Sequence, residues 1–217
     1  MNRRSLILAL ALAVSATACG PKKQPVTPPP DTETTAEPEP PKPPPPPKCE
    51  SLDEKCESKG GKKVKVPGSN LVFEPVLGWR YAHGDKFAVA QAGEEDACMG
   101  LVGYDAPDAK DAKKTEAARQ AQVEALAAEL KINLLKTKVA WKKPDKNNDG
   151  KVPLLLWTIE QDKEVVRGAK KGQLLVVATN PSDGKAVLGI AFVPSDDDKS
   201  GAKIVPSFNT LAAGEAP

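Results

Sequence analysis

Apolar residues are spread unevenly along the 217-residue chain, and their spacing predicts three kinds of segment. Leu6–Val14 is an unbroken apolar run, whereas residues 21–48 contain a single valine as their only large apolar residue. From residue 49 onward, short apolar runs alternate with polar turns, and residues 108–131 interrupt this pattern with helical spacing. The pattern therefore predicts a short N-terminal apolar segment, a segment without a core, and a folded region of mixed type.

Short apolar runs predict strands on both sides of the central helix. Before the helix, strands are expected within residues 64–76, 78–93 and 97–105, with a turn at His83–Asp85. After it, four runs are expected to form strands: 132–141, 152–161, 173–180 and 186–194. The turns between these four runs are short and polar, so neighbouring strands should be antiparallel and form a meander.

Two segments predict helices. Residues 108–131 are rich in Ala, Glu, Lys and Gln, which favour helix, and Val123, Leu126 and Leu130 share one face that could cover a sheet. A second helix is expected over residues 196–212, with Ser195 as its N-cap and a kink at Pro206. The predicted fold class is α+β: an antiparallel β-sheet flanked by one long helix and a C-terminal helix.

The N-terminal apolar run predicts export from the cytoplasm. Arg3 and Arg4 precede it, and its nine residues are too few to span a bilayer. Ala16–Ala18 and Cys19 follow, and this sequence resembles the lipobox of bacterial lipoproteins. The resemblance implies cleavage before Cys19 and attachment of lipid to its thiol, so that the chain is anchored to a bacterial membrane. Gly at position 20, rather than Asp, implies the outer membrane by the sorting rule of enteric bacteria.

Three regions follow from this interpretation. Residues 1–18 are expected to be a signal peptide, and residues 19–48 a lipidated cysteine with a disordered tether. Thirteen of the 22 prolines lie in residues 21–48, which would reach about 85 Å if extended as polyproline II. Residues 49–217 are expected to form a single α+β domain in the cell envelope, on the periplasmic or surface side.

Net charge argues against nucleic acid as a partner. The chain has 31 Lys and Arg against 29 Asp and Glu, but Arg3 and Arg4 leave with the signal peptide. The mature chain is then formally neutral, without the positive charge that nucleic acid binding requires. No polybasic patch for a membrane surface is evident in the sequence either.

Three cysteines remain after Cys19, and their pairing is open. Cys49 and Cys56 could close a small polar loop, which is the favoured pairing, or Cys56 could pair with Cys98. A catalytic cysteine is not expected, because His83 is the only histidine and no C-x-x-C motif exists. The sequence also contains no nucleophile elbow, phosphate-binding loop or dinucleotide fingerprint. We therefore expect no catalysis and no cofactor.

One loop resembles part of a calcium site. Asp145, Asn147 and Asp149, followed by Gly150, match the first half of an EF-hand loop. The twelfth position, which needs a bidentate Glu, is Leu156. A turn rich in Asn, Asp and Gly accounts for the motif more simply, and calcium binding remains the alternative function.

The domain also resembles the PsbP-like family over residues 70–212. The resemblance rests on Gly78–Trp79, on the Ala-rich helix, on Trp141 and Trp157, and on Ile204 with Ser207–Phe208. It implies an antiparallel sheet flanked by helices and a binding or assembly module without catalysis, while ferredoxin-like and other α+β sheets stay open. The expected function is binding of an unknown envelope protein partner, or help in assembling a complex.

Overall fold

The computed structural model describes residues 46–108, 110–135, 137–141, 143–159 and 164–214. The expected signal peptide, Cys19 and nearly all of the tether lie outside these residues. The helices are η1 (Leu52–Glu54), α1 (Ala112–Glu129) and α2 (Asp198–Asn209). The strands are β1 (Val64–Lys65), β2 (Leu71–Phe73), β3 (Arg80–His83), β4 (Ala88–Gln91), β5 (Cys98–Asp105), β6 (Ile132–Asn133), β7 (Asp145–Asn147), β8 (Leu154–Thr158), β9 (Val165–Arg167), β10 (Lys170–Thr179), β11 (Lys185–Pro194) and β12 (Ala212–Ala213).

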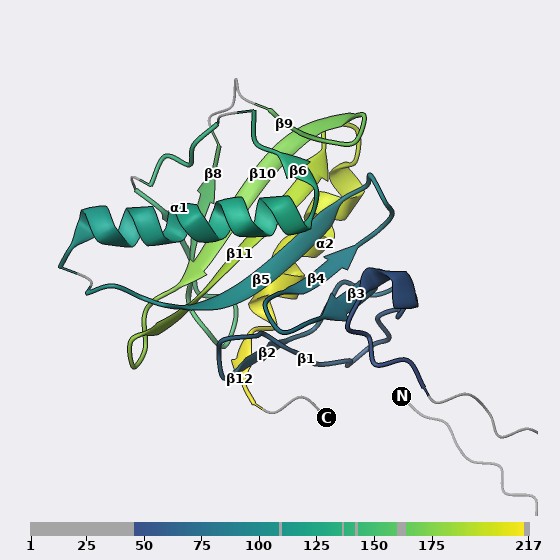
Figure 1. The fold of residues 1–217 in the computed structure, drawn as a ribbon, viewed down its shortest axis with the longest axis horizontal. Helices are drawn as coiled ribbons and strands as arrows, with labels where there is room; N and C mark the ends of the chain where they lie inside the picture. Colours follow the sequence, from purple (N-terminus) through teal and green to yellow (C-terminus); the bar gives the residue numbers. More distant parts are fainter. Residues whose placement is uncertain (1–45, 109, 136, 142, 160–163, 215–217) are drawn as a thin grey trace, which may run out of the picture. The chain divides into compact units, whose positions relative to one another are not determined.

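One large antiparallel sheet organises the domain (Figure 1). Its main path runs β3-β4-β5-β11-β10-β8-β7, with β9 paired to β10 and β6 paired to β9. A small antiparallel sheet has the order β1-β2-β12. Helix α1 covers one face of the large sheet, and α2 lies on the other face (Figure 1). The predicted α+β class, an antiparallel sheet with two flanking helices, is confirmed.

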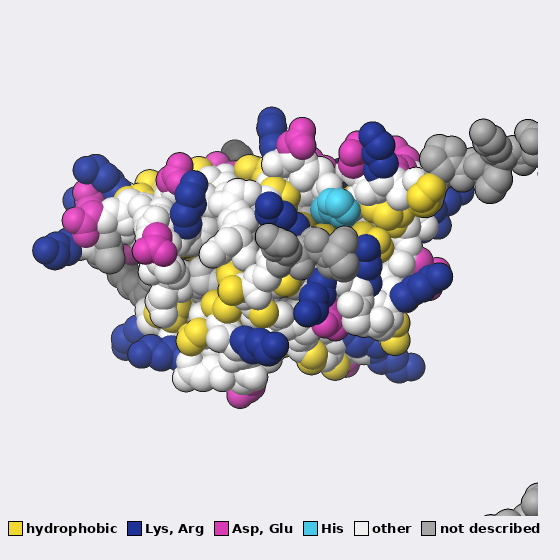
Figure 2. All heavy atoms as spheres, turned by 90° about the horizontal axis from the view of Figure 1, so that it is seen from below, with side chains coloured by type: hydrophobic (Ala, Val, Ile, Leu, Met, Phe, Trp, Pro, Cys, Tyr) yellow, Lys and Arg dark blue, Asp and Glu magenta, His cyan; other side chains and the backbone are white. Residues whose placement is uncertain are grey.

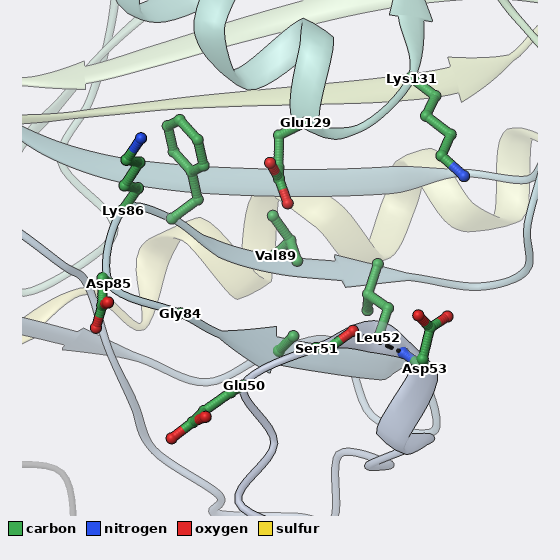
Figure 3. A pocket seen from close by; sticks show the side chains of 12 residues that line it. Glu50, Ser51, Leu52, Asp53, Gly84, Asp85, Lys86, Val89, Glu129 and Lys131 are labelled. Atoms are coloured by element: carbon green, nitrogen blue, oxygen red, sulfur yellow. Dashed lines mark hydrogen bonds between the residues drawn. The ribbon is translucent and has the colours of Figure 1, made fainter.

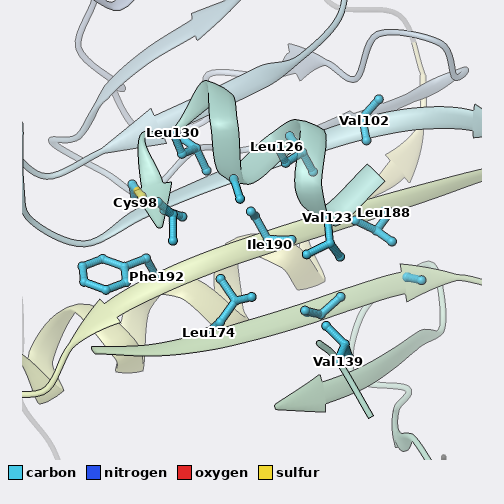
Figure 4. Close-up of a cluster of buried hydrophobic side chains, with 14 of the residues drawn as sticks. Cys98, Val102, Val123, Leu126, Leu130, Val139, Leu174, Leu188, Ile190 and Phe192 are labelled. Carbon is cyan, nitrogen blue, oxygen red and sulfur yellow. The ribbon is translucent and has the colours of Figure 1, made fainter. Parts of the chain in front are cut away.

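Alternating side chains give the large sheet a core on each face. In β11, Leu188, Ile190 and Phe192 point to the α1 side, whereas Val187 and Ala191 point to the α2 side. Figure 4 shows the α1-side cluster. Because both faces are covered, the central strands are apolar at almost every position, as the continuous runs in the sequence predicted.

Helix α1 lies close against the sheet because the residue of β5 beneath it, Gly100, has no side chain. A Cβ atom at Gly100 of β5 would lie 3.0 Å from Leu126 Cδ2 and 3.2 Å from Leu130 Cδ1.

At the start of α1, Asp111 accepts a hydrogen bond from the Lys114 amide at 3.0 Å. This bond, with a second contribution from the Lys114 side chain, lowers the pKa of Asp111.

The start of α2 differs from the sequence prediction. Asp197, not Ser195, is the N-cap, and its carboxylate accepts a hydrogen bond from the Ser200 amide at 3.1 Å. Ser195 instead donates its hydroxyl to Glu164 at 3.3 Å. Pro206 lies inside α2, which continues to Asn209.

The strand expected over residues 132–141 is mostly absent. Only Ile132–Asn133 form a strand, β6, and residues 137–141 have no regular structure. Val139 and Trp141 still pack on the α1-side core. The alternating pattern therefore reflects burial of a loop against the sheet rather than pairing in it. Among the described residues, no helix is both long and apolar enough to cross a membrane.

Candidate functional site

The structure contains one of the two cysteine pairings that the sequence left open. Cys49 and Cys56 form a disulfide with their Cα atoms 5.6 Å apart. Cys98 is free and buried in the α1-side core, so it is not the partner of Cys56. Cys49 is three residues from the start of the described chain, so the disulfide closes a loop where the domain begins.

The loop between the two cysteines, which we call the disulfide loop, is held in shape by a helical turn and by hydrogen bonds. It contains the single-turn helix η1, capped by Ser51. The Glu54 carboxylate accepts hydrogen bonds from the amides of Cys49 at 2.7 Å and Glu50 at 3.1 Å. The bond from Cys49 is the main cause that lowers the pKa of Glu54.

The disulfide loop also covers an edge of the large sheet. The amide of His83 donates to the carbonyl of Cys49 at 2.8 Å, and the amide of Tyr81 donates to the carbonyl of Cys56 at 2.9 Å. Both donors belong to β3, the first strand in the order of the sheet. His83 therefore ends a strand rather than lying in a turn, and its ring stacks on Tyr81. The carbonyls of the two cysteines therefore occupy backbone amides of β3 that could otherwise pair with a strand of another chain.

A hollow of about 570 Å³ lies beside this loop, and we call it the acidic pocket (Figure 3). Three segments far apart in sequence build it: the disulfide loop, the turn between β3 and β4, and the C-terminal end of α1. Its apolar lining includes Leu52, Phe87 and Val89. Its charged lining consists of Glu50, Asp53, Asp85, Glu129, Lys86 and Lys131.

The charge of the acidic pocket favours a cationic ligand. Four carboxylates oppose two ammonium groups, and the C-terminal end of α1 adds partial negative charge. In Figure 3 the Glu129 carboxylate points from α1 toward Val89, so a negative charge lies beside an apolar surface. A basic side chain with an aliphatic stem has the matching character, since its stem can cover apolar atoms while its charged end meets a carboxylate.

No metal site is formed by the described residues, where no three or more His, Cys, Asp or Glu side chains come together to hold an ion. The residues of the expected calcium loop are arranged differently from an EF-hand. Asp145 and Asn147 belong to the extended strand β7, which pairs with β8. Asn147 donates its amide to Asn209 at 3.1 Å and accepts the amide of Asp149 at 2.9 Å. The geometry of an EF-hand loop, which folds alternate oxygens around one ion, is therefore not present in β7, and the segment contacts the end of α2 instead.

Arg167 is a buried residue that the sequence reasoning missed. It lies in β9 and is 3% exposed. Its guanidinium donates to the carbonyls of Leu130 at 2.8 Å, Gly93 at 3.1 Å and Asp96 at 2.6 Å, and to Gln91 Oε1 at 2.5 Å. It therefore ties the end of α1 to β4 and to the turn before β5. A signal was present in the sequence, because Arg167 is in the same alternating phase as the buried Val165.

The two tryptophans after α1 lie together on the α1 side. Trp141 and Trp157 make an edge-to-face contact with ring centroids 5.2 Å apart. The Arg119 guanidinium lies 4.9 Å above the Trp157 ring. Trp157 is buried, and both rings pack in the core, as expected for sheet anchors.

Comparisons with known proteins give only distant likenesses of fold. No family model matches the chain, and no curated protein matches it. A crystal structure from Bacteroides thetaiotaomicron VPI-5482 is similar over 72% of this chain, with 11% identity and a TM-score of 0.45. The chain spans half the length of that protein. The solution structure of the cyanobacterial PsbP protein CyanoP from Synechocystis sp. PCC 6803 is similar over 72% of this chain and 98% of its own. Its identity is 10% and its TM-score 0.42, so neither likeness carries an argument about function.

Proposed function

We propose that the chain is a lipid-anchored protein of a bacterial cell envelope whose domain binds a protein partner or helps a complex to assemble, without catalysis. The sequence around Cys19 supports the anchor, and the proline-rich residues 21–48 support a long tether. The observation that carries partner binding is the acidic pocket, an open hollow with both apolar and charged lining. Such a surface suits a basic segment of a partner protein better than a small substrate, which concave apolar pockets usually enclose.

The anchor is tested by replacing the lipidated cysteine. Cys19→Ala should move the protein from the membrane fraction to the soluble fraction and remove the mass of the lipid from the N-terminus. Cys98→Ala is the matched control and should leave the protein in the membrane. Equal membrane association of the wild type and Cys19→Ala would contradict the anchor.

Partner binding is tested by site-specific crosslinking in intact cells. A photo-crosslinking residue at Lys86, which lines the acidic pocket, should capture one defined protein. The same residue at Asp183, an exposed position on the turn between β10 and β11, is the control. Asp85→Asn with Glu129→Gln should lower the yield at Lys86, because both changes remove negative charge from the pocket. Equal capture at Lys86 and Asp183, or capture of nothing at either position, would contradict the proposal.

A further inference from the structure

Leu77 is the most exposed large apolar side chain among the described residues. It is 67% exposed, whereas its neighbour Val76 is 5% exposed. Both lie in the connection between β2 and β3, which turns at Gly78 with a φ of 79°. The turn therefore presents one leucine to solvent while the preceding residue anchors the connection in the α2-side core.

A groove of about 440 Å³ lies between this connection and α2, and we call it the lysine groove. Its apolar lining consists of Pro75, Val76, Leu77, Ala202 and Pro206. Its two walls are fixed to each other, because Ser207 donates its hydroxyl to the Glu74 carbonyl at 2.5 Å and Thr210 Oγ1 accepts the Glu74 amide at 2.7 Å. The groove is therefore a built feature of the surface rather than a gap between loosely packed parts.

Charged side chains line the groove beside the exposed leucine. They are Lys59, Lys203 of α2, and Glu74. Lys62 and Lys63 follow the Gly60–Gly61 turn, which also lines the groove. Backbone bonds of Ser58 with Trp79 at 2.8 Å and with Gly78 at 2.9 Å hold this lysine-bearing segment beside the Leu77 turn.

These lysines, like most lysines of the described residues, make no ion pair, although, after the hydrogen bond from Ser200, the charge of Lys203 contributes to lowering the pKa of Asp197. Lys170 and Lys185 each make an ion pair with an aspartate, at 2.5 and 2.7 Å. None of Lys59, Lys62, Lys63 and Lys203 makes an ion pair with a carboxylate of the described residues. On the face seen in Figure 2, hydrophobic atoms lie among Lys and Arg side chains over the lower half, with Asp and Glu side chains between them.

We propose that Leu77 and the four lysines around the lysine groove form a face that docks on an anionic membrane surface. A leucine can enter the boundary between headgroups and acyl chains, and each lysine near anionic lipid strengthens binding by about fivefold. The inference rests on the proposed anchor for the presence of a membrane. A tether that reaches about 85 Å when extended would allow the domain either to stand away from the lipid or to return to it. The anchor holds the chain at the membrane, whereas the docking face decides how the domain meets that membrane.

The test uses the mature chain with Cys19→Ser, so that no lipid contributes, and measures sedimentation with vesicles. Vesicles of phosphatidylcholine alone are compared with vesicles containing three parts in ten of phosphatidylglycerol. We expect binding to the anionic vesicles to be at least about 25-fold tighter. This preference should be lost in 0.5 M salt, because salt screens the attraction between the lysines and the anionic lipid. Leu77→Ser should weaken binding about tenfold, and Lys59→Gln with Lys203→Gln about 25-fold.

Matched controls separate this face from general charge and hydrophobicity. Leu135→Ser changes the other exposed leucine, and Lys110→Gln with Lys113→Gln changes two exposed lysines at the start of α1. Each control should leave binding within about twofold of the parent chain. Circular dichroism checks that every variant is folded.

Equal binding to neutral and anionic vesicles would overturn the docking face, and so would an equal loss of binding in the controls. If Cys19→Ala releases the protein from cell membranes but the unlipidated chain does not bind anionic vesicles, the anchor is supported and the docking face is contradicted. A photo-crosslinking residue at Leu77 that captures a protein instead of lipid would also overturn it, in favour of a second protein-binding surface.

Discussion

At the scale of single residues, Arg167 shows how much stability one buried side chain can carry. Arg167→Met keeps the length of the side chain but leaves four acceptors without their donors: three carbonyls and Gln91 Oε1. We expect the free energy of unfolding, measured by guanidinium titration, to fall by about 2–5 kcal/mol. Arg80→Met, at an exposed position of β3, should change it by less than about 0.5 kcal/mol. Similar effects of the two substitutions would contradict this role.

Cys98 lies close enough to Arg167 to be influenced by its charge. Burial raises the pKa of the Cys98 thiol to about 11, and the positive charge of Arg167 lowers it by less. The thiol is therefore protonated and shielded at neutral pH. In the Cys19→Ser chain, iodoacetamide at pH 8 should modify Cys98 only as fast as the domain unfolds, and denaturant should restore the reaction.

The raised pKa of the Cys98 thiol makes the free energy of unfolding depend on pH in a defined direction. The native thiol keeps its proton where the unfolded thiol, with a pKa near 9.0, loses it. The free energy of unfolding should therefore fall as the pH rises from about 9 through about 11, and fall less in Cys98→Ala. Fast modification of the native protein, or equal pH profiles in the two chains, would show that Cys98 is not shielded.

At the scale of elements, the disulfide loop stabilises the edge of the sheet on which it lies. Replacing both partners, Cys49→Ser with Cys56→Ser, should lower the free energy of unfolding by about 2–3 kcal/mol, since the residues are only seven positions apart. Hydrogen exchange should then accelerate most at the amides of Tyr81 and His83, which donate to the loop. Amides between β10 and β11 serve as the control and should change only by the global loss of stability. A uniform change at all amides would contradict local protection of β3.

The elements also show which parts of the fold the sequence could reveal. Strands β10 and β11 were predictable because a strand buried on both faces needs apolar residues at nearly every position. The strand expected over 132–141 was wrong because a loop that packs on a sheet can show the same alternation as a strand. The acidic pocket could not be predicted, since its three segments meet only in the folded chain. The burial of Arg167 could have been predicted, because it lies two residues after the apolar Val165 and so faces the same side of β9.

At the scale of the whole domain, the central strands supply side chains to two cores at once. Successive residues of β5, β10 and β11 point alternately to the α1-side and α2-side clusters. Some positions admit almost no extra volume: a Cβ at Gly189 of β11 would lie 2.8 Å from Phe208 of α2 and 2.9 Å from Leu101 of β5. Because the same backbone supports both cores, neither can be lost while the other keeps its native packing.

This shared sheet predicts that the two cores unfold together, and the tryptophans allow each to be followed. Trp79 lies in the α2-side cluster, whereas Trp141 and Trp157 report on the α1 side. Trp79→Phe leaves fluorescence from the α1 side only, and Trp141→Phe with Trp157→Phe leaves it from the α2 side only. In each variant, the guanidinium midpoint from fluorescence should coincide with the midpoint from far-ultraviolet circular dichroism. If fluorescence from either side changed before the circular dichroism signal, that core would be unfolding on its own, and the sheet would not couple the two faces.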